Sequence, residues 1–163
     1  MIAWRRFWHT GLILFGILIA GSAMSGGKPD ITAPGPDGLQ GIFWLINQHD
    51  RNGIAAWLDS GGEIEARGFL GASPAPAAAV ADNWPTVLFL LERGARGDIA
   101  DGQGFTLGYL ATRSRVLPES RLGGALAKVR VILAERGVLS RIYQPAEVRR
   151  MKADGRWPPV GFR

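Results

Sequence analysis

Few side chains in this sequence have the chemistry that catalysis or metal binding requires. The 163 residues include no cysteine and two histidines, which excludes disulfides, thiolate metal sites and cysteine nucleophiles. His9 lies in an apolar leader, and we interpret His49 and Asp50 as a solvated or helix-capping pair. Glu63 and Glu65 are interpreted as polar residues of a turn. We therefore expect a protein without catalytic, cofactor-binding or metal-binding residues, and not an enzyme.

Three short motifs resemble functional sites but are better explained by structure. The segment DGQG at 101–104 starts like a calcium loop and lacks the further carboxylates that such a loop needs. The glycine-rich stretches lack the Lys-Ser/Thr of a phosphate loop. Residues 96–98 spell the adhesion tripeptide RGD within LLERGARGD, which instead predicts a helix that ends at Gly94 and enters a turn.

The charge is distributed unevenly along the chain. The formal net charge is +5, but residues 1–112 carry 7 Lys/Arg against 10 Asp/Glu, whereas residues 113–163 carry 12 against 4. A basic C-terminal part is compatible with an anionic partner, although a solvated basic face is the commoner explanation.

Residues 1–24 are interpreted as a cleaved secretory signal or an uncleaved membrane anchor, with a buried N-terminal helix as a third alternative. Arg5 and Arg6 precede an uncharged apolar run at 11–23 that ends in small residues, as in a signal peptide. Residues 7–24 are 18 uncharged residues, close to the roughly 20 that span a bilayer. The two arginines stay on the inner side of the membrane. A cleaved signal and an uncleaved anchor therefore both place the rest of the chain in the periplasm, either free or anchored to the inner membrane.

A spacing of 33 residues recurs among the glycines that follow. It separates Gly61 from Gly94, and it separates Gly38, Gly71 and Gly104 from one another. A period of this length is typical of repeat proteins built from short helical units. Residues 25–37, which are rich in Gly and Pro, then form an expected flexible linker before the repeats.

Each period contains the signals of two helices. In the second period Ser73 is a candidate N-cap and Pro74 suits the first helical position. The chain breaks at residues 82–83, and Gly94 ends the second helix. The buried stripe of that second helix is predicted to be Val87, Leu90 and Leu91. The sequence predicts helix pairs at 42–60, 74–93 and 106–136.

This pattern resembles the ankyrin repeat, which has a period of about 33 residues with a turn and two helices. The third unit, DGQGFTLGYLA at 101–111, matches the family's first half, with Leu107 in place of Pro and Tyr109 in place of His. The resemblance covers about residues 35–140. It implies an all-α solenoid of about three helix–turn–helix repeats at 38–140, followed by a C-terminal capping helix and basic tail at 141–163.

The third unit departs from the period. Gly94 and Gly137 are 43 residues apart, ten more than the period, and the extra residues are expected within TRSRVLPESRLGG, between the two helices. Insertions of this kind form loops on one face of a solenoid, frequently the binding face.

The resemblance implies a non-catalytic protein–protein interaction scaffold that binds through its turn tips and first helices. Phe69 and Phe105 are aromatic anchors or pack between adjacent turns, and the arginines bind carboxylates or phosphates or are solvated. The candidate partner-binding residues are Phe69, Leu70, Gln103, Phe105, Arg113, Arg115 and Arg121.

An alternative function is an envelope-surface protein that binds anionic lipid through its basic C-terminal segment. The residues that would do so are Arg141, Arg149, Arg150, Lys152 and Arg156. No nucleic acid is expected as a partner, because an exported chain seldom meets it.

Overall fold

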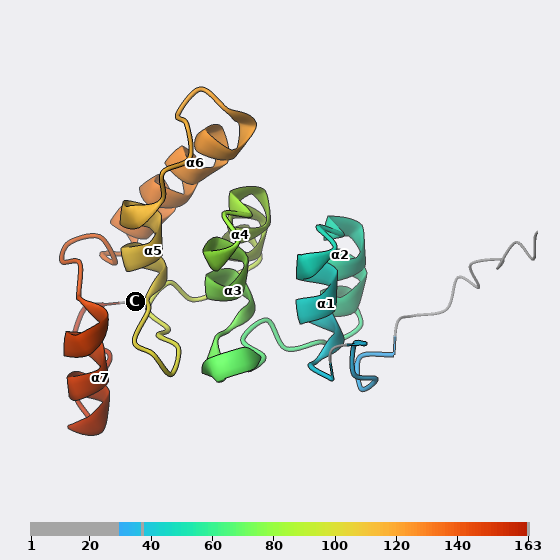
Figure 1. Ribbon diagram of the computed structural model, residues 1–163, viewed down its shortest axis with the longest axis horizontal. Coiled ribbons are helices and arrows are strands. Elements are labelled where there is room, and N and C mark those ends of the chain that lie inside the picture. The colour runs from blue at the N-terminus through green and yellow to red at the C-terminus, as the bar shows by residue number, and fades with distance from the viewer. Residues whose placement is uncertain (1–29, 37, 163) are drawn as a thin grey trace, which may run out of the picture.

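The computed structural model describes residues 30–36 and 38–162, and in these ranges every regular element is a helix (Figure 1). The expected all-α class is therefore confirmed for the described part. The signal or anchor expected at 1–24, and the first residues of the expected linker, lie outside it. None of the helices found in the described ranges is long and apolar enough to cross a membrane.

The helices follow one another as three pairs that stand side by side (Figure 1). Within each pair the two helices pack together, α3 contacts both α1 and α5, and α4 packs against α6. The helix pairs predicted from the sequence are present. Their bounds are α1 (Gly41–Asn47) and α2 (Arg51–Asp59), α3 (Pro74–Val80) and α4 (Trp84–Glu92), and α5 (Leu107–Arg113) and α6 (Arg121–Glu135).

Side-chain caps explain where several helices begin. Asp50 Oδ1 accepts the Gly53 N–H at 2.9 Å at the start of α2, and Thr106 Oγ1 accepts the Tyr109 N–H at 3.1 Å at the start of α5. Ser73 occupies the predicted N-cap position of α3, but its side chain makes no capping bond. The two prolines of the first turn, Pro74 and Pro76, have no N–H to donate.

A continuous apolar core joins the three pairs. The predicted stripe of α4 is buried, with Val87 and Leu90 at 0% and Leu91 at 1% exposure. The core continues through the neighbouring pairs with Ile42, Ile54, Leu107, Val129 and Leu133. Because the middle pair touches both neighbours, its buried residues stabilise the whole stack.

The 33-residue spacing is present in the backbone hydrogen bonds as well as in the glycines. A turn precedes each first helix and is closed by an N–H to carbonyl bond that recurs at this interval. The bonds run from Gly35 to Leu39 (2.6 Å), from Gly68 to Ala72 (2.9 Å) and from Asp101 to Phe105 (3.1 Å). The hydrogen-bonded structure thus starts inside the segment 25–37 that was expected to be a linker.

Positive φ angles recur at the same interval. The turns before the first helices contain Gly38, Gly71 and Gly104, with φ of 75°, 71° and 87°. Glycine adopts this left-handed region without the steric cost that other residues meet. The periodic glycines of the sequence are thus the residues that shape each turn.

The ten extra residues of the third pair are divided between a loop and a helix. Three residues, 81–83, join α3 to α4, whereas seven, 114–120, join α5 to α6; α6 has 15 residues against 9 in α4. The expectation that the whole insertion separates the two helices is therefore only partly correct. Ser120 caps α6 by accepting the Gly123 N–H at 3.0 Å, which starts the helix four residues before the expected ALAKVRVILAERG segment.

The C-terminal segment lies against the turn of the third pair. It contains α7 (Pro145–Ala153), in which Val148 is fully buried. The Trp157 Nε1–H donates to the Asp98 carbonyl at 3.1 Å, and the rings of Tyr143, Trp157 and Phe162 meet edge to face. The segment therefore covers the end of the third unit.

Candidate binding groove

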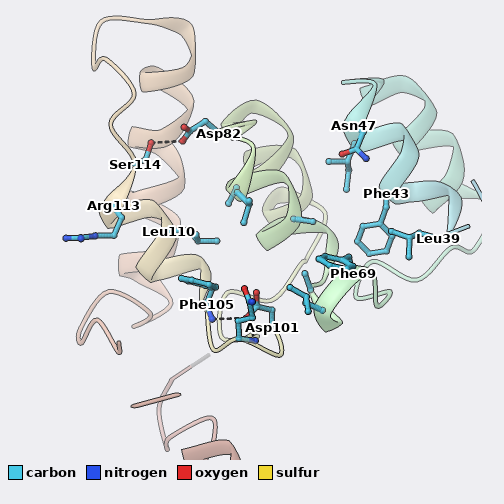
Figure 2. A pocket seen from close by; sticks show the side chains of 17 residues that line it. Leu39, Phe43, Asn47, Phe69, Asp82, Asp101, Phe105, Leu110, Arg113 and Ser114 are labelled. Carbon is cyan, nitrogen blue, oxygen red and sulfur yellow. Dashed lines mark hydrogen bonds between the residues drawn. The ribbon is translucent and has the colours of Figure 1, made fainter. Parts of the chain in front are cut away.

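A groove of about 540 Å³ runs along the first helices α1, α3 and α5 and the turns that precede them (Figure 2). It lies on the side of the stack where five of the predicted binding residues gather. Its larger apolar lining residues are Leu39, Phe43, Ile46, Phe69, Leu70, Phe105 and Leu110.

The turn before α3 presents two apolar side chains to this groove. The short 3₁₀ helix Phe69–Gly71 leaves Phe69 72% exposed and Leu70 45% exposed. The backbone here is held by its neighbour, because the Gly102 N–H donates to the Leu70 carbonyl at 2.7 Å. Leu70 has a φ of 54°, a conformation that costs free energy in a branched residue. The turn is thus fixed while its side chains remain accessible.

Phe105 lines the groove from the next turn but is half-buried. Its ring lies 5.6 Å from the Tyr109 ring, and its N–H donates to Asp101 Oδ1 at 2.8 Å. Gln103 is exposed beside it and donates its own N–H to the same carboxylate at 2.9 Å. Phe105 therefore both packs within its turn and contributes to the groove wall.

A polar group of side chains closes the groove near the inter-helix turns (Figure 2). The Ser114 hydroxyl and the Trp84 indole N–H both donate to Asp82 Oδ1 at 2.8 Å. These bonds link the turn after α3 to the loop after α5. The Asp82 carboxylate is therefore engaged in holding two units together.

The three predicted arginines lie in different places. Arg113 lines the groove at its rim, with its guanidinium 6.0 Å from the Tyr109 ring centroid. Arg121 lines a separate hollow with His49. Arg115 is exposed and lines neither. The structure thus places Arg113 beside Tyr109 at the groove rim, with its side chain directed away from the groove aromatics (Figure 2), and leaves the other two arginines outside the groove.

Several groove residues were missed by the sequence reasoning, although the period contained a signal for them. Stepping back from Arg113 by 33 and 66 residues reaches Val80 and Asn47, and both line the groove. A step of 66 residues back from Phe105 reaches Leu39, which also lines it. Applying the period to each candidate would therefore have found them.

The polar pairs singled out in the sequence have structural positions. Asp50 is the N-cap of α2, as the capping interpretation expected. Glu65 Oε1 accepts the Arg96 N–H at 2.6 Å, and burial is the main cause that raises the pKa of this carboxyl. Asp98 is 2% exposed and forms an ion pair with Arg96. Within the described ranges, no three His, Asp or Glu side chains gather as a metal site would require.

Most of the basic residues of the C-terminal segment donate to the chain itself. Arg149 donates to the Gln103 carbonyl at 2.6 Å and Lys152 to the Asp101 carbonyl at 2.9 Å. Arg141 pairs with Glu147, and Arg156 with Asp154. These side chains thus fasten the C-terminal segment to the third turn or to itself.

Comparisons of the chain with protein-family models and with curated proteins found no match. The functional assignment therefore rests on the geometry of the groove and on the periodic structure around it.

Proposed function

We propose that this chain is a short ankyrin-type repeat protein that binds a partner protein in the groove and catalyses no reaction. The observation that carries the proposal is the exposure of Phe69, at 72%, on a turn whose backbone is fixed by the adjacent turn. A large apolar side chain held in water on a rigid support gains free energy when a partner covers it. Aromatic residues of this kind dominate the binding energy of many interfaces.

The ankyrin assignment is supported by the recurrence of three turns with the same closing hydrogen bond and the same glycine conformation. Each turn is followed by two antiparallel helices. In that family the turn tips and first helices form the binding face, which is the face that holds this groove.

The groove has the composition of an interface, with an apolar centre and a polar rim. Phe69, Leu70 and Phe105 provide the apolar surface, and Gln103 and Arg113 lie exposed at its edge. We propose a partner that inserts apolar side chains between the two turns and places an acceptor near the Arg113 guanidinium.

The proposed location is outside the cytoplasm, in the periplasm or anchored in the inner membrane. This proposal rests on Arg5, Arg6 and the apolar run at 11–23. A phosphatase fused after residue 40 should be active outside the cytoplasm; activity confined to cytoplasmic reporters would contradict it. The lipid-binding alternative is less favoured, because Arg149 and Lys152 donate to carbonyl groups of the third turn.

The test is quantitative affinity capture from cells that express the protein, using three versions of the full chain. Phe69→Ser removes the proposed anchor, and Val131→Ser is the matched control, since Val131 is 57% exposed on α6 and does not line the groove. We expect a partner that the wild type and Val131→Ser retain and that Phe69→Ser loses. Equal retention by all three versions would contradict the proposal.

A further inference from the structure

A second hollow, of about 530 Å³, lies where the inter-helix turns of the three pairs meet. It shares no lining residue with the groove described above. Each pair contributes polar side chains to it: His49 and Arg51 from the first, Asn83 and Thr86 from the second, and Ser120 and Arg121 from the third. The seven-residue loop that precedes α6 carries Arg121 to this position.

The cationic side chains of the hollow differ from most others in the described part of the chain. Arg93 pairs with Asp59, and Arg136 donates to the carbonyls of Leu91 and Ala95. The guanidinium groups of Arg51 and Arg121, by contrast, make no hydrogen bond or ion pair within residues 30–36 and 38–162. Two exposed arginines on the lining of one hollow, neither of them in an ion pair within these ranges, give it a positive potential that attracts an anion.

The acidic groups nearby in the described part of the chain form no ion pair with these arginines. Asp50 Oδ1 caps α2, and Asp82 Oδ1 accepts bonds from Ser114 and Trp84. Neither carboxylate lines the hollow, nor does Glu119, which is exposed on the loop. The lining of the hollow therefore has no acidic residue.

A buried donor adds to this arrangement. Asn83 lines the hollow and is 5% exposed, and its Nδ2 has no hydrogen-bond partner in the described part of the protein. A buried amide donor is normally hydrogen-bonded. Because this Nδ2 is closed to solvent, the Asn83 side chain would have to rotate for its amide to reach an acceptor in the hollow. The first turn of α6, which begins at Arg121, contains no acidic residue, so its partial positive charge also favours an anion.

We propose that this hollow binds a phosphate group, either free or as the headgroup of an anionic lipid. Arginine binds phosphate through two parallel N–H bonds, and the geometry of its guanidinium suits this anion. The volume lies within the range of about 300–1,000 Å³ typical of small-molecule sites, so the hollow also has room for the group that carries the phosphate. The exposed Leu117 and Leu122, at 71% and 39%, flank Arg121 and would enter the interface of a lipid bilayer.

Binding of inorganic phosphate to the full chain tests the site directly. The two histidines of the chain are His9 and His49, so NMR can follow the ring of His49 during a titration. We expect a saturable shift of that signal. Arg51→Gln and Arg121→Gln should each weaken binding about tenfold or more, since each removes a charge-assisted hydrogen bond.

Lys128→Gln is the matched control, because the Lys128 side chain is exposed on α6, lines neither hollow and makes no hydrogen bond or ion pair in the described residues. It should bind phosphate as the wild type does. Phe69→Ser should also retain phosphate binding while it loses the protein partner, so that failure of the groove proposal and failure of this one remain distinguishable.

Vesicles separate the two sources of phosphate. A preference of the full chain for phosphatidylglycerol over phosphatidylcholine vesicles that falls in Arg121→Gln and Leu117→Ser would identify the lipid headgroup. If phosphate binding saturates and the vesicle preference is the same in the wild type and all variants, the natural ligand is a free phosphate compound. The inference is overturned if phosphate binding does not saturate and the vesicle preference is unchanged by the variants, or if Lys128→Gln loses as much binding as Arg121→Gln.

Discussion

Helix α4 and the turn that precedes α3 belong to the same unit but expose their apolar side chains very differently. Val87 and Leu90 of α4 are fully buried, whereas Phe69 is 72% and Leu70 45% exposed. The helix is held by side chains that pack against its neighbours. The turn is held by backbone hydrogen bonds and by Gly71. Its side chains are therefore less buried than those of α4, and Phe69 is accessible to a partner.

The largest effect is expected in the helix. Leu90→Ala should lower the free energy of unfolding by about 2–5 kcal/mol, because it loses transfer free energy and leaves a cavity between pairs that both depend on α4. Urea denaturation of the variant beside the wild type measures this. A loss of unfolding free energy below about 1 kcal/mol would mean that the neighbouring pairs do not depend on the middle pair for their stability.

The turns themselves can be compared through two glycines with positive φ. In Gly61→Ala the new methyl group meets open space, so only the left-handed backbone costs free energy, about 1–2 kcal/mol. In Gly104→Ala the methyl group would also clash with the Pro145 carbonyl, which adds about 1–3 kcal/mol. If Gly61→Ala and Gly104→Ala lose the same unfolding free energy, measured by thermal or urea unfolding, α7 does not pack against the third turn.

The exposure of Phe105 lies between that of Leu90, which is buried, and that of Phe69, which is exposed. It is half-buried against Tyr109, so Phe105→Ala should cost about 1–2 kcal/mol, less than Leu90→Ala. The same urea experiment ranks the two variants. A loss as large as that of Leu90→Ala would make Phe105 a core residue and remove it from the binding face.

Burial raises the pKa of Glu65 above its usual 4.5, which predicts a small pH dependence. The folded state binds a proton more tightly than the unfolded state here, so stability is greatest below about pH 4.5 and falls as pH rises through the elevated pKa. Glu65→Gln keeps an acceptor for the Arg96 N–H and removes the titration. The unfolding free energy of this variant should therefore not fall between acidic and neutral pH as that of the wild type does. If the pH dependence is unchanged, a group other than Glu65 causes it.

The periodic part of the fold could be predicted because glycine spacing and apolar stripes are local signals. Gly71 and Gly104 mark turns whose conformation admits few other residues, and Leu90 follows from helical periodicity. The division of the insertion was missed, because the glycines of RLGG at 121–124 disfavour helix in isolation. Ser120 and packing of Leu126 and Val129 override that preference.

The candidate site was predictable in part for the same reason. Phe69 and Phe105 were found as aromatic residues of turns, which the sequence identifies directly. The roles of Arg149 and Lys152 were not found, because their acceptors are carbonyl groups about 50 residues away in the chain. Pairing with distant backbone leaves no pattern in the sequence of a single protein.

The turn before α3 should bind the partner without stabilising the fold, and this can be measured as the affinity of the captured partner for Phe69→Ser. Isothermal titration should show binding at least about thirtyfold weaker than wild type, as loss of an aromatic anchor costs about 2 kcal/mol or more. The unfolding free energy should stay within about 0.5 kcal/mol of wild type. If Phe69→Ser binds the partner with an affinity within twofold of wild type, as the control Val131→Ser should, then the turn before α3 is not the binding element.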